Sequence, residues 1–170
     1  MPTTRFPARY IPSALSRRDK ARQYRMLQKS RKQYTQHNYY TRKRLTSFKD
    51  KKSPHVLKAR AVYKIKNITP NRELAQKTGC SVAALKKIVK KGEGAYYSSG
   101  SRPNQTPQSW GLARLASSIT SGKAAAVDYK IMDEGCDHKK KAFRLASKAR
   151  KTYKQGRSKA RKSIFDIFKN

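Results

Sequence analysis

The sequence has 170 residues, of which 43 are Lys or Arg and only 9 are Asp or Glu, so its formal net charge is +34. A compact chain with this charge repels itself, which predicts a polyanionic partner. No window is apolar enough to span a membrane. The first residues include Pro2, Pro7 and Pro12 without an apolar segment, so no secretory signal is expected.

The charge is unevenly distributed along the chain. Residues 67–137 contain 10 Lys or Arg and 6 Asp or Glu, whereas residues 1–66 contain 20 and 2. The near-neutral middle is therefore the part expected to fold on its own, as a core of about 60–70 residues. This predicts an all-α protein with one small helical domain, flanked by extended basic arms. The expected segments are an N-terminal arm (1–16), a basic helical and aromatic arm (17–66), the helical core (67–137), a basic helix (138–156) and a C-terminal tail (157–170).

The N-terminal arm is expected to be extended because its prolines disfavour a helix. It carries apolar side chains suited to a partner surface, namely Phe6, Tyr10 and Ile11. Ser16 and Asp19 have the spacing of a capping box and predict a helix from Arg17 to about Tyr34. This helix has few apolar residues, so it should fray in isolation.

Aromatic and basic residues alternate between Tyr34 and Ser53, a composition typical of surfaces that follow a nucleic-acid strand. A solvated loop whose tyrosines pack on the protein is the alternative. The candidate phosphate contacts in this segment are Arg42, Lys43 and Arg44. Ser53 and Pro54 then predict the start of another short helix.

Two helices joined by a glycine turn are expected next. The first begins at Thr69-Pro70 and ends at Gly79, and the second is capped by Ser81 and ends at Gly92. This spacing is typical of a helix-turn-helix, although a plain helical hairpin would give the same pattern. The second helix has an apolar face and a lysine-rich face. Its core candidates are Leu85 and Ile88, and its candidate phosphate contacts are Lys86, Lys87, Lys90 and Lys91.

A polar loop is expected over residues 92–107. The backbone N–H groups of the Ser98–Arg102 turn and the Arg102 side chain could bind a phosphate; alternatively, Arg102 caps carbonyl groups within the loop. Thr106-Pro107 predicts another helix start, and residues 124–133 could form a further helix. Trp110 is interpreted as a core anchor, with base stacking as the alternative. The expected core positions of this part are Trp110, Leu112, Leu115 and Ile119.

One module resembles a known group of proteins. It consists of the run Leu85–Gln105, whose loop contains Gly94-Ala95-Tyr96-Tyr97-Ser98-Ser99-Gly100-Ser101-Arg102-Pro103, and the later Trp110-Gly111-Leu112-Ala113-Arg114 and Gly122-Lys123. It is similar to a module in small basic proteins of nucleocytoplasmic large DNA viruses that infect algae and amoebae, and in proteins of tailed phages. The resemblance covers about residues 70–132. It implies a viral origin and no known activity.

The C-terminal part combines basic and apolar residues. Asp137 is expected to cap a basic helix that runs to Gln155. The basic tail after it ends in four large apolar residues, Ile164, Phe165, Ile167 and Phe168. They are suited to a groove of a partner protein. Docking on the protein's own core and contact with an anionic membrane face are alternatives.

No catalytic or metal site is evident, and no cofactor is expected. Asp133 and Glu134 are adjacent, so on a helix they point about 100° apart. Cys136 and His138 lack a second pair of zinc ligands. Cys80 and Cys136 are interpreted as two separate reduced thiols, which predicts synthesis in a reducing intracellular compartment.

The sequence therefore predicts a non-enzymatic virion protein. The preferred hypothesis is a small minor capsid protein that bridges larger capsid proteins on the inner side of the shell, because both ends carry apolar side chains. Alternatives are a non-specific DNA-binding or genome-condensing protein, a helix-turn-helix regulator and a protein of ribosomal type.

Overall fold

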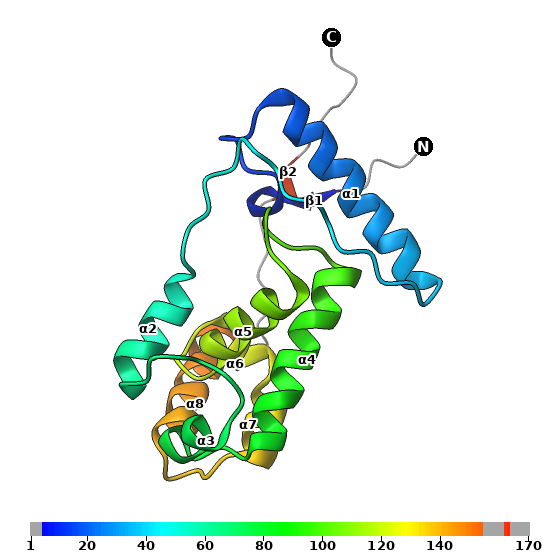
Figure 1. The fold of residues 1–170 in the computed structure, drawn as a ribbon. Coiled ribbons are helices and arrows are strands. Elements are labelled where there is room, and N and C mark those ends of the chain that lie inside the picture. Colours follow the sequence, from blue (N-terminus) through cyan, green and yellow to red (C-terminus); the bar gives the residue numbers. More distant parts are fainter. Residues whose placement is uncertain (1–4, 155–161, 164–170) are drawn as a thin grey trace. The chain divides into compact units, whose positions relative to one another are not determined.

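The computed structural model describes residues 5–154 and 162–163, and these are mostly helical, which confirms the expected all-α class (Figure 1). The α-helices of this part are α1 (Arg17–Thr35), α2 (Pro54–Tyr63), α3 (Arg72–Thr78), α4 (Val82–Ser98), α5 (Pro107–Ser118), α6 (Lys123–Val127), α7 (Tyr129–Gly135) and α8 (Lys141–Tyr153). A 3-10 helix, η1 (Ala8–Tyr10), follows strand β1 (Phe6–Pro7), which pairs antiparallel with β2 (Lys162–Ser163). No described helix is both long enough and apolar enough to cross a membrane.

The chain forms two compact units instead of one core with arms. Of the described residues, unit 1 comprises 5–51, 94–107 and 162–163, and unit 2 comprises 52–93 and 108–154. The expected boundaries of the core at 67 and 137 do not coincide with the boundaries of either unit. The basic segments on either side contribute buried side chains to both units, among them Leu27, Ala59 and Ala146.

Unit 2 has a continuous hydrophobic core. Helices α6, α7 and α8 pack against one another, and α2 contacts α3. Four of the expected core residues, Leu85, Ile88, Leu115 and Ile119, are fully buried there. Leu112 is partly buried against the same core, whereas Trp110 is only half-buried and is not the expected anchor.

Several helix starts follow the expected capping residues. Ser16 accepts a hydrogen bond from Asp19 N at 3.2 Å, and Ser81 accepts one from Ala84 N at 3.1 Å. Ser53 precedes α2 and accepts from Val56 N. α3 instead starts after Asn71, because the Asn71 side chain accepts from Leu74 N at 2.9 Å.

Helix α4 continues through Gly92, so the expected helix end there is wrong. A Cβ on Gly92 would lie 2.6 Å from the backbone Cα of Gly111 in α5, and one on Gly111 would lie 2.6 Å from the Val89 carbonyl. Both glycines therefore permit a close approach of two helices, and Gly92 does not act as a terminator. The polar loop is correspondingly shorter than 92–107 and begins after Ser98.

The two later helices also differ from the expected ranges. The helix expected over residues 124–133 is divided at Asp128 into α6 and α7. α8 begins at Lys141, well after Asp137, because the Asp137 carboxylate accepts from Lys139 N at 2.9 Å in the preceding turn. α8 ends at Tyr153, and the expected helix end at Gln155 lies outside the described residues.

Cys80 and Cys136 are joined in a disulfide, which corrects the interpretation as two separate thiols. Two backbone hydrogen bonds flank this link, Ser81 N to the Gly135 carbonyl and Asp137 N to the Gly79 carbonyl, each at 2.7 Å. They hold the turn between α3 and α4 against the end of α7. The two cysteines are 56 residues apart in the sequence, so their pairing depends entirely on the fold.

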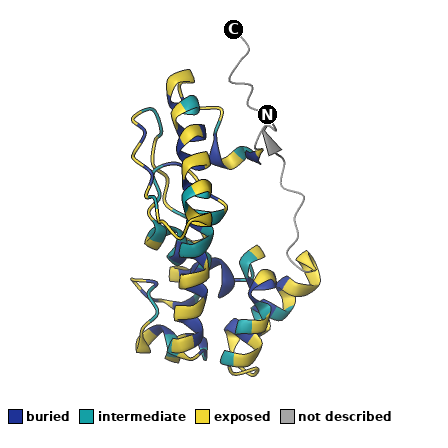
Figure 2. Ribbon diagram, turned by 90° about the vertical axis from the view of Figure 1, so that its right-hand side faces the viewer, coloured by how far each residue is buried: buried dark blue, intermediate teal, exposed yellow. Residues whose placement is uncertain are grey.

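Unit 1 is organised around α1. The helix buries Tyr24, Met26 and Leu27, and the Gln23 amide donates to the Tyr10 carbonyl at 3.0 Å. Leu15 and Leu45 form a small cluster with Met26. Figure 2 shows that helices of the protein are buried along one side and exposed along the other. In α1 this packing compensates for the low apolar content that predicted fraying.

Candidate nucleic-acid interface

Three of the four expected lysines of α4 lie on its exposed face. Leu85, Ile88 and Val89 turn into the core of unit 2, which leaves the opposite side of the helix to solvent. The exposed cations on that side are Lys86, Lys87 and Lys90. Among the ion pairs of the described residues, none includes these three side chains.

Lys91, the fourth of these lysines, forms an ion pair with the buried carboxylate of Asp128. Its ammonium lies 2.9 Å from Asp128 Oδ1. Arg114 donates to the same carboxylate from Nε and Nη2, each at 2.8 Å, and Ser118 Oγ lies 3.3 Å away. Burial alone would raise the pKa of Asp128, but the hydrogen bonds and charges of Arg114 and Lys91 outweigh it and hold that pKa below its ordinary value. Lys91 therefore stabilises the fold.

Arg42 is buried and is not available to a phosphate, so its assignment as a contact is wrong. Its guanidinium donates to Ser30 Oγ at 2.8 Å, to the Tyr96 carbonyl at 3.0 Å and to Ser101 Oγ at 2.8 Å. These groups come from α1, from α4 and from the loop after α4. Arg42 thus connects its own segment to α1, and to the end of α4 and the adjoining loop, which lie 54 and 59 residues later in the sequence.

The remaining candidates of unit 1 are exposed. Lys43 and Arg102 both face solvent. Arg44 also does, but it forms an ion pair with Asp50, which is itself held by the Asn104 amide at 2.9 Å. Lys43 and Arg102 are accordingly more available to a ligand than Arg44.

The loop after α4 is packed against unit 1. Gly100 has a φ of +106°, and a Cβ there would lie 2.7 Å from Leu27 Cδ2. Asn104 accepts from Leu45 N at 2.7 Å and donates back to the Leu45 carbonyl at 3.2 Å. The Ser101 hydroxyl accepts from Arg42. These contacts support the interpretation of the loop as part of the structure of unit 1.

The tyrosines near the end of α1 form an exposed aromatic group. Tyr39 is 66% exposed. Its ring centroid lies 5.0 Å from that of Tyr97 and 6.2 Å from that of Tyr34. Tyr40 is covered by Lys29, whose ammonium lies 4.5 Å from its ring centroid. Tyr39 is thus the tyrosine of this group most available for stacking on a base.

The described part of the N-terminal arm, which was expected to bind a partner, is packed within unit 1. Phe6, Tyr10 and Ile11 are all buried, and the Phe6 ring meets Tyr24 edge-on with centroids 5.6 Å apart. The Arg31 guanidinium carbon also lies over the Phe6 ring, 4.1 Å from the ring centroid. The apolar side chains complete the protein's own core, which explains the misassignment. The expected C-terminal anchor, Ile164, Phe165, Ile167 and Phe168, lies outside the described residues.

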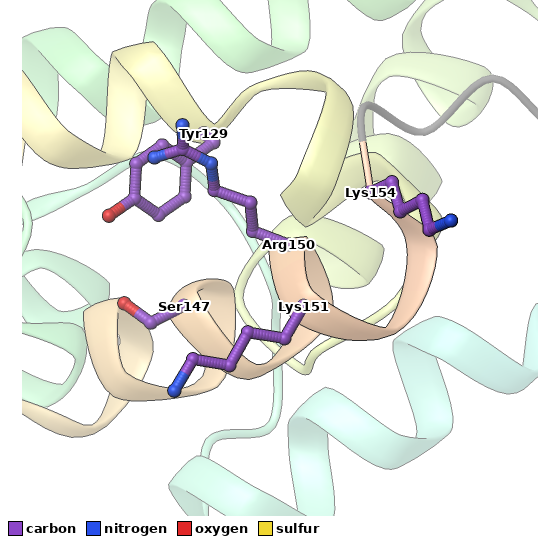
Figure 3. A pocket seen from close by; sticks show the side chains of 5 residues that line it. All are labelled: Tyr129, Ser147, Arg150, Lys151 and Lys154. Atoms are coloured by element: carbon purple, nitrogen blue, oxygen red, sulfur yellow. The ribbon is translucent and has the colours of Figure 1, made fainter.

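A basic hollow beside α8 was not expected from the sequence. Figure 3 shows its lining, which consists of Tyr129 from α7 and of Ser147, Arg150, Lys151 and Lys154 from α8 and the residue after it. The Arg150 guanidinium lies 4.4 Å from the Tyr129 ring centroid. Cations are common in the last turn of a helix, because the negative end of the helix dipole favours them, so their presence in the sequence does not by itself indicate a binding site. The same dipole disfavours an anion at this end of α8, so the hollow is a weaker site than the exposed face of α4.

Among the described residues, one histidine lies beside an acidic side chain at the surface. Asp133 and Glu134 are exposed, and His138 Nε2 lies 3.1 Å from Asp133 Oδ1. In the part of the chain that the structure describes, no three His, Cys, Asp or Glu residues lie together as a metal-binding group.

Comparison with known proteins places the chain in a family. The model of a family of unknown function, DUF5824, matches residues 7–141, which is most of the chain. The protein therefore belongs to this family. No curated protein and no solved structure matches the sequence.

Proposed function

We propose that this member of the DUF5824 family is a non-enzymatic structural protein of a virus particle that binds double-stranded DNA through its charge and without reading its sequence. The observation that carries the proposal is the arrangement of opposite charges. Asp19, Asp50 and Asp128 form hydrogen bonds within the protein. Lys86, Lys87 and Lys90 of α4 instead face solvent. Such a surface suits phosphate groups, which supply most of the affinity in non-specific binding.

The exposed face of α4 favours phosphate contacts over base recognition. Apart from Lys91, which is paired with Asp128, the exposed residues of α4 are Ala83, Lys86, Lys87 and Lys90. Base pairs are commonly read in the major groove by bidentate Arg, Asn or Gln side chains. Lysine is a point charge on a flexible chain and binds phosphate without such geometry. This argues against the helix-turn-helix regulator, although α3, the glycine turn and α4 follow one another as in that motif.

The location in a virion is supported by the sequence resemblance. The module over residues 70–132 is similar to one in basic proteins of large DNA viruses. In a particle, DNA and the inner capsid surface are the polyanionic partners within reach. A protein that stabilises packaged DNA there needs high positive charge and no active site.

A bridging minor capsid protein is the second candidate. The specific feature that favours it is the apolar sequence Ile164–Phe168 after a basic run, which is suited to a groove between larger subunits. The matching argument from the N-terminus no longer applies, because Phe6, Tyr10 and Ile11 are buried in unit 1. Deleting residues 164–170 tests this role, because unchanged incorporation into particles would contradict it.

The test of DNA binding compares two duplexes of about 30 base pairs with unrelated sequences, a length that exceeds the footprint of a small domain. We expect dissociation constants that agree within about threefold, because phosphate contacts carry no sequence information. Absence of binding would contradict the proposal. A large preference for one sequence would instead favour the regulator.

A further inference from the structure

The longest helix of unit 1 has a continuous cationic stripe. It consists of Arg18, Arg22, Arg25, Lys29 and Lys32, all exposed, at successive spacings of four, three, four and three residues. At 100° per residue these positions fall within about 80° of one another, and at 1.5 Å per residue they extend over about 21 Å. We refer to these five residues as the α1 stripe.

Contacts on the opposite side of α1 hold the helix so that the stripe faces solvent. Tyr24 and Leu27 are buried in unit 1, and Ser30 Oγ donates to the Tyr97 carbonyl at 3.0 Å. The N-terminal end is held by Asp19, whose carboxylate accepts from Ser47 N at 3.0 Å and from Ser47 Oγ at 2.6 Å. Asp19 is the one acidic residue of α1, and its side chain is buried; the hydrogen bonds from Ser47, with smaller contributions from the charges of Arg22 and Arg18, lower its pKa.

The stripe is unfavourable for an isolated helix. Neighbouring like charges three or four residues apart repel, and the stripe contains four such pairs in a row. Lys29 also covers the Tyr40 ring, but within residues 5–154 no ion pair includes Arg18, Arg22, Arg25 or Lys32. An anionic partner along the helix would remove this repulsion, and no large apolar side chain lies between the cations to suit a lipid surface.

We infer that the α1 stripe is the surface on which the phosphate backbone of double-stranded DNA docks. This inference rests on the proposed function. Measured along the duplex axis, one DNA strand carries a phosphate about every 3.4 Å, but the strand winds around that axis, so a straight line of about 21 Å meets only the phosphates on one side of the duplex. Five cations held in one line on a helix concentrate positive charge along that side of the duplex, which a diffuse basic surface does not. The stripe thus supplies the main contacts, and the lysines of α4 are secondary.

The test compares two variants of equal charge in the full-length protein. Arg18→Gln, Arg22→Gln, Arg25→Gln and Lys32→Gln remove four cations of the stripe and leave Lys29 on Tyr40. Lys58→Gln, Arg60→Gln, Arg72→Gln and Lys77→Gln remove four exposed cations from α2 and α3. Gln has nearly the helix propensity of Lys and Arg, so both variants should keep their helical circular dichroism.

We expect the slope of log K against log salt to become less negative by about 3–4 in the stripe variant and by less than about 1 in the control. Equal losses in the two variants would overturn the inference while leaving DNA binding intact. Failure of the unchanged protein to bind DNA would overturn the proposed function and the inference with it. Binding of an acidic protein or RNA but not duplex DNA would have the same consequence.

A second measurement on the unchanged protein does not depend on the folding of a variant. Lysine acetylation is compared with and without duplex DNA. We expect strong protection of Lys32 and little protection of Lys58 and Lys77. Equal acetylation of Lys32 in the two conditions would overturn the inference.

Discussion

Arg42 and Tyr96 contact each other through both their side chains and their backbones. The Arg42 guanidinium carbon lies 3.7 Å from the Tyr96 ring centroid, and Nη1 donates to the Tyr96 carbonyl at 3.0 Å. In return, the Tyr96 hydroxyl accepts from Arg42 N at 2.9 Å. Burial lowers the pKa of the Arg42 guanidinium and raises that of the Tyr96 hydroxyl. A residue that resembled a phosphate ligand in the sequence is therefore central to the stability of unit 1.

Arg42→Ala should lower the free energy of unfolding by about 2–4 kcal/mol, because it leaves buried hydrogen-bond acceptors unpaired. Lys43→Ala, next to it and exposed, should change stability by less than about 0.5 kcal/mol. Urea denaturation measures both. If both substitutions had equally small effects, the assignment of Arg42 as a structural residue would be wrong.

The two glycines within α4 should respond in opposite directions to alanine. Gly92→Ala would place a methyl group 2.6 Å from the Gly111 backbone, so α4 and α5 must separate. We expect a loss of about 1–3 kcal/mol, as for other overpacked sites. A Cβ on Gly94 meets nothing within 4 Å. Gly94→Ala should therefore stabilise the helix by about 0.5–1 kcal/mol. Thermal denaturation of the pair is the measurement, and destabilisation by both would contradict the packing argument.

These glycines also show what the sequence could and could not predict. Local signals were reliable where the side chain acts on its own helix, as for Ser16, Ser53 and Ser81. Apolar spacing likewise identified Leu85 and Leu115 as core residues. A glycine after a lysine-rich turn, however, has the same local sequence whether it ends a helix or contacts a neighbouring one. The difference depends on Gly111, which is distant in the sequence.

The candidate site was predicted less well for the same reason. Lysines 86, 87 and 90 were placed correctly on the exposed side of α4, because their positions alternate with core residues. Whether an individual cation is free depends on its tertiary partners, as Lys91 and Arg42 show. The disulfide between Cys80 and Cys136 and the burial of Phe6 also depend on contacts between distant segments, which composition does not reveal.

The buried Asp128 should make stability depend on acidic pH. Its pKa is held below the ordinary value of 3.8 in the folded protein, so the ionised form favours folding. This contribution is complete above the unfolded pKa of about 3.9 and is lost as the pH falls through the lower folded value. Asp128→Asn should therefore destabilise the protein at pH 7, and its difference from the unchanged protein should shrink below about pH 4. Denaturation at both pH values tests this, and a difference that is independent of pH would contradict it.

The disulfide should contribute to stability without being required for folding. It links residues 56 apart, and closing a loop of this size is worth about 4 kcal/mol in the chain-entropy account. The combined change Cys80→Ala and Cys136→Ala should lower the free energy of unfolding by up to about that amount. The backbone hydrogen bonds on either side should keep the helical circular dichroism unchanged. Denaturation with and without a reducing agent makes the measurement, and insensitivity of the unchanged protein to reduction would contradict it.

The most direct test of the account is the salt dependence of DNA binding by the unchanged full-length protein. If about eight phosphates are neutralised, log K should fall with log salt at a slope near −7, equally for duplexes of unrelated sequence. Fluorescence anisotropy over a series of salt concentrations gives this slope. A slope near zero, or binding that persists for only one sequence at high salt, would contradict the proposal that this protein binds DNA through charge alone.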